Sequence, residues 1–161
     1  MNEEKNTRQR NLLIEAQEKN EFLNALSTNE TYFFREEHHF NFLVDLVKEQ
    51  KNLTIWSAAA SMGAEAYSIS FILDYYLGVN SWKVYGSDIN TEVIKIARKG
   101  LYPLSWSEKI PQPYRSKYCL KGNNKYANKM LVDMRLRENI EFFRHNLLDT
   151  NIDIDQCDVI F

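Results

Sequence analysis

The sequence predicts an α/β protein with a Rossmann-like parallel sheet. Three observations favour this fold: two short apolar runs of strand-forming residues, a helical pattern after each of them, and a return of the strand pattern near the end of the chain. The two runs cover residues 53–61 and 82–89, and later strands are expected within residues 139–149 and 157–161. Strands that are apolar throughout are typical of parallel sheets covered on both faces.

Apolar residues at helical spacing predict four helices. The first covers about residues 10–26, and the second carries Phe40, Leu43, Val44 and Val47. The third follows Gly63, ends at Gly78 and places on one face Ala66, Ile69, Ser70, Leu73, Tyr76 and Leu77. The fourth is capped by Asn90 or Thr91, ends at Gly100 and carries Val93, Ile94 and Ala97.

Residues 101–138 interrupt this alternation. They contain all three prolines and the polar stretch KGNNKYANK, which predicts loops and a small β insertion at about residues 115–138. We therefore expect an N-terminal helical segment over residues 1–50 and an α/β domain over residues 51–161.

No helix follows the last strand to cover it, and Val159 and Ile160 would lie on an unpaired edge. This pattern predicts a chain that is truncated at its C-terminus.

Composition excludes several classes of protein. The 161 residues are 44% hydrophobic and 13% aromatic, which is enough for a packed core. A net charge of −2 argues against a nucleic-acid binder, and no run approaches the roughly 20 apolar residues of a membrane span. No secretory signal precedes the domain, so a cytoplasmic protein is expected. No metal site is expected either, because His38 and His39 lack a third ligand.

Two positions at the expected strand ends could hold a ligand. The stretch SAAASMGAEAYS, residues 57–68, combines small side chains with a helix start, so a ligand could approach the backbone closely. It lacks the Gly-x-Gly-x-x-Gly pattern and the lysine of a phosphate-binding loop. Asp88 ends the next strand, where an acid often accepts hydrogen bonds from a ribose; the alternative is an ordinary helix cap.

Four segments resemble, in order, the signatures of the CheR family of methyltransferases. They read TNETYFFRE, IWSAAASMGAEAYSIS, SDINTEVIKIARKGLY and NLLD followed by DVIF, and the resemblance covers about residues 27–161. It implies S-adenosylmethionine as the cofactor, with S-adenosylhomocysteine as the product. It also implies that glutamate side chains in the cytoplasmic region of chemotaxis receptors are the methyl acceptors.

The resemblance also implies the site residues. Arg35 is expected at the reacting centre, above a floor formed by the neighbouring aromatic residues; the alternative for it is a surface ion pair with Glu36 or Glu37. The cofactor-binding residues would be Asn29, Thr31, Arg35, Glu65, Asp88, Asn146 and Leu147. For Glu65 the alternative is an acid that only stabilises the first turn of its helix.

The chain departs from the family pattern at Ala64 and Ala66, which replace a Glu and a Pro. The family's Cys-Arg-Asn segment after DVIF is not present in these 161 residues. A non-catalytic module that binds S-adenosylmethionine or S-adenosylhomocysteine is therefore the alternative function. Docking of a receptor tail on residues 118–128 and self-association through the open sheet edge are further expectations.

Overall fold

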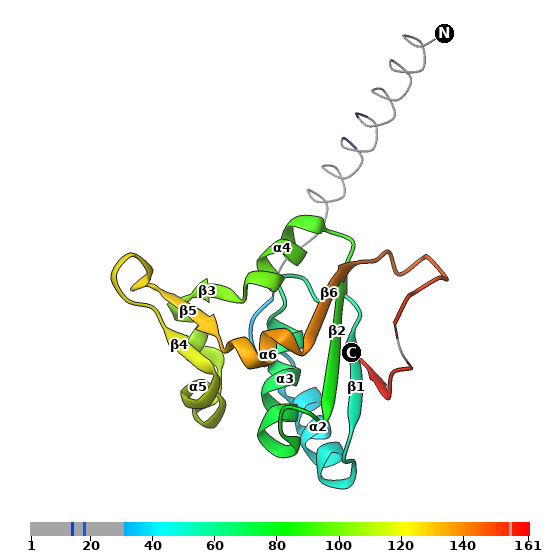
Figure 1. Cartoon of the computed structure of the whole chain (residues 1–161), viewed down its shortest axis with the longest axis horizontal. Coiled ribbons are helices and arrows are strands. Elements are labelled where there is room, and N and C mark those ends of the chain that lie inside the picture. Colours follow the sequence, from blue (N-terminus) through cyan, green and yellow to red (C-terminus); the bar gives the residue numbers. More distant parts are fainter. Residues whose placement is uncertain (1–13, 15–17, 19–30, 155) are drawn as a thin grey trace.

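Two sheets organise the chain in the computed structural model, which describes residues 14, 18, 31–154 and 156–161. The larger sheet is parallel and consists of β1 (Leu53–Ser57), β2 (Trp82–Asp88), β6 (Ile140–Arg144) and β7 (Val159–Ile160), in the order β6-β2-β1-β7. The smaller sheet projects from its side (Figure 1). The predicted parallel α/β fold is confirmed. The helix predicted over residues 10–26 lies, apart from Ile14 and Glu18, outside the described residues.

Helices cover one face of the parallel sheet. These are α3 (Ala64–Leu77), which packs on β1 and β2, and α4 (Thr91–Lys99), which packs on β2 and β6. The short α6 (Met134–Glu138) contacts β6 as well as α3, and α2 (Glu37–Glu49) packs against α3 from outside. The side-chain oxygen of Asn90 accepts the N–H groups of Glu92 and Val93, so Asn90 is the cap of α4. None of the described helices is both long and apolar enough to cross a membrane.

The central helix α3 is buried on more than the one face that its apolar spacing predicts. Tyr67, Phe71 and Ile72 are as deeply buried as the predicted residues Ile69 and Leu73. Tyr76, which the spacing places on the buried face, is 44% exposed. The reason is that α3 lies between the sheet on one side and α2 and α5 (Gln112–Tyr118) on the other.

The strand predicted over residues 53–61 is shorter than expected. It ends at Ser57, and a turn over residues 58–63 leads into α3. Ser61 has φ 48° and Gly63 has φ 89°, so both lie in the left-handed region that reverses the chain. Of the small residues at positions 58–61 only Ala60 is buried, and Ala59 is exposed, so this run predicts neither strand geometry nor uniform burial.

The smaller sheet is antiparallel and lies within the segment that was expected to form a β insertion. It contains β3 (Leu101–Pro103), β4 (Cys119–Lys121) and β5 (Lys129–Val132), in the order β3-β5-β4. Two short helical turns, η1 (Leu104–Lys109) and η2 (Asn124–Tyr126), and helix α5 complete it. This sheet joins the main body through the hydrophobic core, to which Tyr102, Tyr118, Met130 and Val132 belong.

The turn before α3 should tolerate no side chain at Gly63. A Cβ atom there would lie 2.9 Å from the Cβ of Ala97 and 3.1 Å from Cζ of Phe142, in addition to the cost of a positive φ. Gly78 is a matched control because it has φ 81°, but a Cβ atom added there would have no neighbour within 4 Å. We expect Gly63→Ala to lower the free energy of unfolding by at least about 1 kcal/mol more than Gly78→Ala, as measured by urea denaturation. Equal losses would show that the packing around Gly63 is loose.

The thiol of Cys119 should be unreactive. Burial raises the pKa of Cys119 to about 12, although the positive charge of Arg115 lowers it in part. At pH 8 the thiol is therefore protonated in the folded protein, and only the thiolate is nucleophilic. In a Cys157→Ser variant we expect Ellman's reagent to react slowly at pH 8 and rapidly after unfolding. Fast reaction in the native state would contradict this prediction.

Candidate functional site

A pocket of about 190 Å³ lies at the carboxyl edge of the parallel sheet. It is lined by Ala58, Ala59, Asp88, Ile89, His145, Asn146 and Leu147. Asp88 is the last residue of β2, and the other residues come from the segments that follow β1, β2 and β6, which is where open parallel sheets bind their ligands. Three of the predicted cofactor-binding residues, Asp88, Asn146 and Leu147, are thus brought together.

Asp88 is fixed by backbone hydrogen bonds. Its Oδ2 accepts the N–H of Ser61 at 2.9 Å, and its Oδ1 accepts the N–H of Asn90 at 2.9 Å. Because Asn90 supplies the side-chain cap of α4, the alternative role of Asp88 as that cap is wrong. A carboxylate has about four acceptor positions, so two remain for other donors.

The segment after β6 forms the opposite wall of the pocket. The N–H of His145 donates to the backbone oxygen of Asp88 at 3.0 Å, which extends the pairing of β6 with β2. The side-chain oxygen of Asn146 accepts the N–H of Leu148 at 3.1 Å, and Leu147 is 55% exposed. His145 and Ile89 were not predicted as site residues. Their only signal in the sequence is their position: Ile89 is the last residue of an expected strand, and His145 lies in the segment 139–149, where a strand was expected to run into a loop.

Glu65 lies in the first turn of α3 and is held from the end of β1. The hydroxyl of Ser57, which is fully buried, donates to Oε1 of Glu65 at 2.7 Å. This bond turns the carboxylate back toward the carboxyl edge of the sheet, rather than leaving it in solvent at the helix start. The role of Ser57 was not predicted from the sequence.

The aromatic run at residues 32–34 divides between core and surface. Phe33 packs edge-on against Tyr102 at 5.2 Å, and Phe34 stacks on Tyr114 at 5.4 Å. The N–H of Phe34 donates to the hydroxyl of Ser68 in α3 at 3.0 Å. Neither Phe33 nor Phe34 lines the pocket, so the two rings anchor this segment to α3 and the smaller sheet rather than forming a floor for it.

Arg35 follows this anchored turn and is exposed. Its Cζ lies 6.0 Å from the centroid of the Tyr32 ring. Thr31 is half-buried directly before Tyr32, whereas Asn29 lies outside the described residues. The structure therefore does not place Arg35 in the lining of the pocket that holds Asp88.

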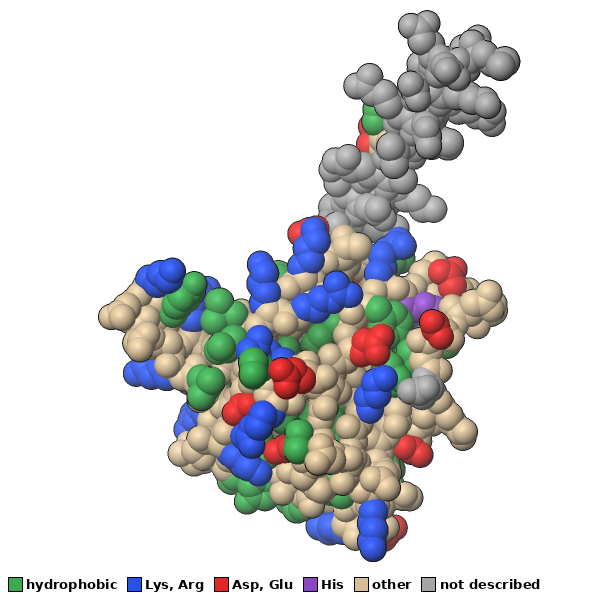
Figure 2. Space-filling view, viewed as in Figure 1, with side chains coloured by type: hydrophobic (Ala, Val, Ile, Leu, Met, Phe, Trp, Pro, Cys, Tyr) green, Lys and Arg blue, Asp and Glu red, His purple; other side chains and the backbone are tan. Residues whose placement is uncertain are grey.

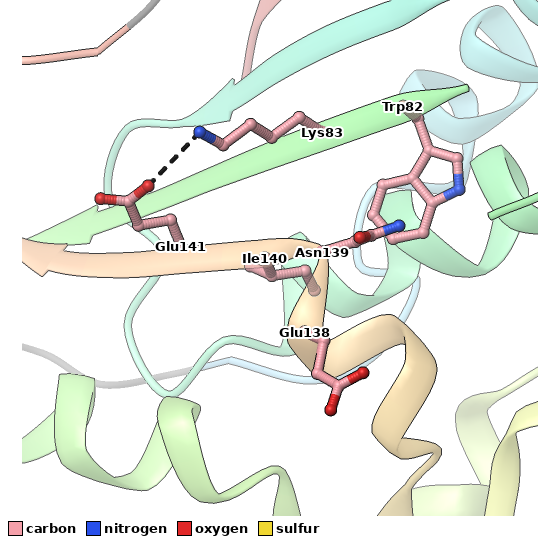
Figure 3. Close-up of a pocket in the computed structure, with 6 residues that line it drawn as sticks. All are labelled: Trp82, Lys83, Glu138, Asn139, Ile140 and Glu141. Atoms are coloured by element: carbon pink, nitrogen blue, oxygen red, sulfur yellow. Dashed lines mark ion pairs between the residues drawn. The ribbon is translucent and has the colours of Figure 1, made fainter. Parts of the chain in front are cut away.

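A second pocket of about 420 Å³ lies at the opposite edge of the sheet (Figure 3). It is lined by Trp82, Lys83, Glu138, Asn139, Ile140 and Glu141. Lys83 and Glu141 reach toward each other from neighbouring strands, with Nζ and Oε2 3.4 Å apart. None of the predicted site residues lies here, and the amino ends of parallel strands are not where such sheets bind ligands.

The order of the parallel strands defines the class of protein. Numbered along the chain, the four strands follow the order 3-2-1-4 of the Rossmann fold, and the pocket with Asp88 lies at their carboxyl ends. This is the arrangement of a Rossmann-like domain that binds its ligand at the carboxyl ends of the strands. Residues 29–161 match the family described as CheR methyltransferase, SAM binding domain, and the chain belongs to that family.

Several relatives of the chain are named chemotaxis protein methyltransferases. The chain is 44% identical over 147 residues to chemotaxis protein methyltransferase 2 of Pseudomonas aeruginosa. The matched region covers 87% of this chain and 52% of that relative. It is 39% identical over 136 residues to the chemotaxis protein methyltransferase of Salmonella typhimurium, and the match covers 83% of this chain and 47% of that relative. It is 38% identical over 130 residues to the chemotaxis protein methyltransferase of Escherichia coli, and this match covers 79% of the chain and 46% of the relative. The chain spans about half the length of these curated relatives.

The residues around the pocket suit S-adenosylmethionine, the cofactor of this family domain. The carboxylate of Asp88 retains acceptor capacity for a ribose, and Ala58 and Ala59 leave room for a ring against the backbone. Glu65 lies outside the residues that line this pocket and is a second carboxylate, at the start of α3, that can accept from an ammonium group. These hydrogen-bond acceptors suit the hydroxyl and ammonium donors of the cofactor.

We expect Asp88→Asn to loosen the turn before α3. An amide has one acceptor oxygen, so it can replace only one of the two bonds to the N–H groups of Ser61 and Asn90. The expected loss is about 1–2 kcal/mol in the free energy of unfolding, together with faster hydrogen exchange at the Ser61 amide. Asp153→Asn, at an exposed loop position, serves as the control. An unchanged exchange rate at Ser61 would contradict the prediction.

Proposed function

We propose that the chain forms the core of an enzyme that transfers a methyl group from S-adenosylmethionine to glutamate side chains of chemotaxis receptors. The observation that carries the proposal is the meeting of Asp88, Asn146 and Leu147 at the carboxyl edge of a Rossmann sheet, in a chain that belongs to the CheR family. The names of its relatives support chemotaxis as the setting.

The pocket residues would bind the adenosine half of the cofactor. Asp88 is proposed to accept hydrogen bonds from the ribose hydroxyls through the acceptor positions that Ser61 and Asn90 leave open. Asn146 and Leu147 would lie against the adenine, since both follow β6 in the wall opposite Ala58. The apolar side chain of Leu147, which is otherwise exposed to solvent, would then be covered.

The methionine half would lie between α3 and the anchored turn at residues 31–35. Glu65 is proposed to accept from the ammonium group, and Arg35 to bind either the cofactor carboxylate or the acceptor carboxylate. Thr31 and Asn29 are proposed contacts of the same half. The bond from Phe34 to Ser68 supports this placement, because Ser68 lies one helical turn after Glu65.

The reaction needs alignment more than proton transfer. When bound, S-adenosylmethionine supplies a methyl group on a positively charged sulfur. A glutamate side chain with an ordinary pKa of about 4.3 is already ionised at neutral pH, so no residue of this chain has to act as a general base. The task left to Arg35 and the surrounding backbone is to hold the cofactor or the acceptor carboxylate so that the two reactants are in line, and to exclude water.

A non-catalytic module that binds S-adenosylmethionine or S-adenosylhomocysteine is the second candidate. It is favoured by one observation, that Ala64 and Ala66 stand at the start of α3, where the family pattern has a Glu and a Pro. In either case we propose a cytoplasmic protein with a helical segment over residues 1–50, an α/β domain over residues 51–161 and a β insertion at about residues 115–138. Neither membrane insertion nor nucleic-acid binding is part of the proposal.

The smaller sheet is the proposed docking place for a receptor tail, within residues 118–128. Hydrophobic and basic side chains gather over this sheet (Figure 2), and the exposed residues there include Leu120, Tyr126, Lys121, Lys125 and Lys129.

Self-association is proposed through the edge strand β7. This strand has β1 on one side, and its Ile160 is 61% exposed. Both proposals concern partners of the protein and are independent of the cofactor site.

Calorimetry with S-adenosylhomocysteine tests the cofactor site. We expect the wild-type chain to bind, and Asp88→Ala to weaken binding by at least about tenfold, because the ribose hydroxyls lose a charged acceptor. Asp153→Ala should bind like the wild type. Methylation of receptor-containing membranes then separates the two candidates: binding with methyl transfer supports the enzyme, and binding alone supports the module. If the wild-type chain does not bind S-adenosylhomocysteine, both candidates are wrong.

A further inference from the structure

Ser57 is the one polar residue on the buried side of β1. It shares this side of the strand with Leu53 and Ile55, which belong to the hydrophobic core. A buried hydroxyl costs free energy unless it is hydrogen-bonded. The hydroxyl of Ser57 donates at 2.7 Å to Oε1 of Glu65, in the first turn of α3. The bond offsets the cost of burial and ties this carboxylate to the end of the strand.

The turn before α3 is fixed by hydrogen bonds that do not involve the hydroxyl of Ser57. The N–H of Ser61 donates to Oδ2 of Asp88 at 2.9 Å, and the hydroxyl of Tyr102 donates to the backbone oxygen of Met62 at 2.6 Å. Loss of the Ser57 hydroxyl would therefore leave the turn in place and release only the carboxylate at the start of α3.

A carboxylate that is already ordered binds a cation more tightly than a mobile one. A glutamate side chain has several rotatable bonds, and a ligand that must order them loses part of its binding free energy. The bond from Ser57 orders the side chain of Glu65 in advance. It uses one of the roughly four acceptor positions of a carboxylate, so the group retains capacity for a ligand.

Glu65 and Asp88 belong to separate parts of the candidate site. Asp88 lines the pocket at the carboxyl edge of the sheet, whereas Glu65 lies outside that lining. Backbone N–H groups hold the carboxylate of Asp88, and the hydroxyl of Ser57 holds that of Glu65. Removing this hydroxyl is therefore expected to affect only the part of a ligand that Glu65 binds, and not the part in the pocket.

We propose that Ser57 is a positioning residue for the amino-acid half of the cofactor. It holds Glu65 in the orientation that accepts from the ammonium group, and it thereby sets the preference of the site for ligands that carry this group. The inference rests on the proposed function, which assigns the ammonium group to Glu65. Ser57 itself does not contact the cofactor and acts only through the carboxylate.

Two ligands that differ by one amino group test the proposal. They are S-adenosylhomocysteine and its desamino analogue, in which hydrogen replaces the amino group. In calorimetry we expect Ser57→Ala to weaken binding of S-adenosylhomocysteine by about three- to tenfold, and to change the affinity for the desamino analogue by less than about twofold. Ser70→Ala is the matched control, because its equally buried hydroxyl donates to the backbone oxygen of Tyr67 within α3. This control should bind both ligands like the wild type.

A double-mutant cycle tests whether Ser57 acts through Glu65. Glu65→Ala should remove most of the preference for the amino group, and Ser57→Ala should then cause no further loss. Equal weakening of both ligands by Ser57→Ala overturns the positioning role, as do additive losses in the double variant and an unchanged affinity of Ser57→Ala for S-adenosylhomocysteine.

The positioning role and the proposed function fail in different ways. If the wild type does not bind S-adenosylhomocysteine, the proposed function is refuted. If the wild type binds S-adenosylhomocysteine and the desamino analogue equally, the cofactor pocket stands and the positioning role is overturned. Ser57→Ala removes a single oxygen atom, and the carboxylate that it releases is only half-buried and can be hydrated. Urea denaturation verifies that each variant folds.

Discussion

The hydrogen bond from the Ser61 N–H to the Asp88 carboxylate is the interaction on which the geometry of the site depends. It joins the turn after β1 to the end of β2, and the bond from the Ala60 N–H to the backbone oxygen of Ser87 runs beside it at 2.8 Å. The N–H of His145 ties the third segment to Asp88. Three chain segments are thereby held around one carboxylate, so hydrogen bonds within the chain fix the shape of the pocket.

A second constraint comes from the aromatic residues outside the sheet. Phe33 and Phe34 link α3, the smaller sheet and the turn that carries Arg35. Each aromatic pair adds about 0.5–1.5 kcal/mol beyond the burial of its area. The hydroxyl of Tyr102 continues this connection, because it donates to the backbone oxygen of Met62 at 2.6 Å in the turn before α3. The aromatic cluster therefore positions both sides of the candidate site.

Departures from the sequence-based expectations have local physical causes. Residues 58–60 are alanines, which are compatible with a buried strand, but the turn needs a left-handed residue at Ser61 to bring its N–H to Asp88. Tyr76 has the spacing of a core residue, yet it lies near the end of α3, where it is largely exposed. The rings of Phe33 and Phe34 do not reach the pocket, because the turn at these residues directs them into the core.

The sequence by itself determined the alternation of strands and helices, the start of α4 at Asn90 or Thr91 and its end at Gly100, and the placement of Asp88 at a strand end. These features depend on backbone preferences and burial patterns within a few residues, which local sequence encodes. Only the tertiary structure decided that His145 and Ala58 face one pocket and that Ser57 holds Glu65. Those contacts depend on the register and packing of segments far apart in the chain, and no local pattern specifies them.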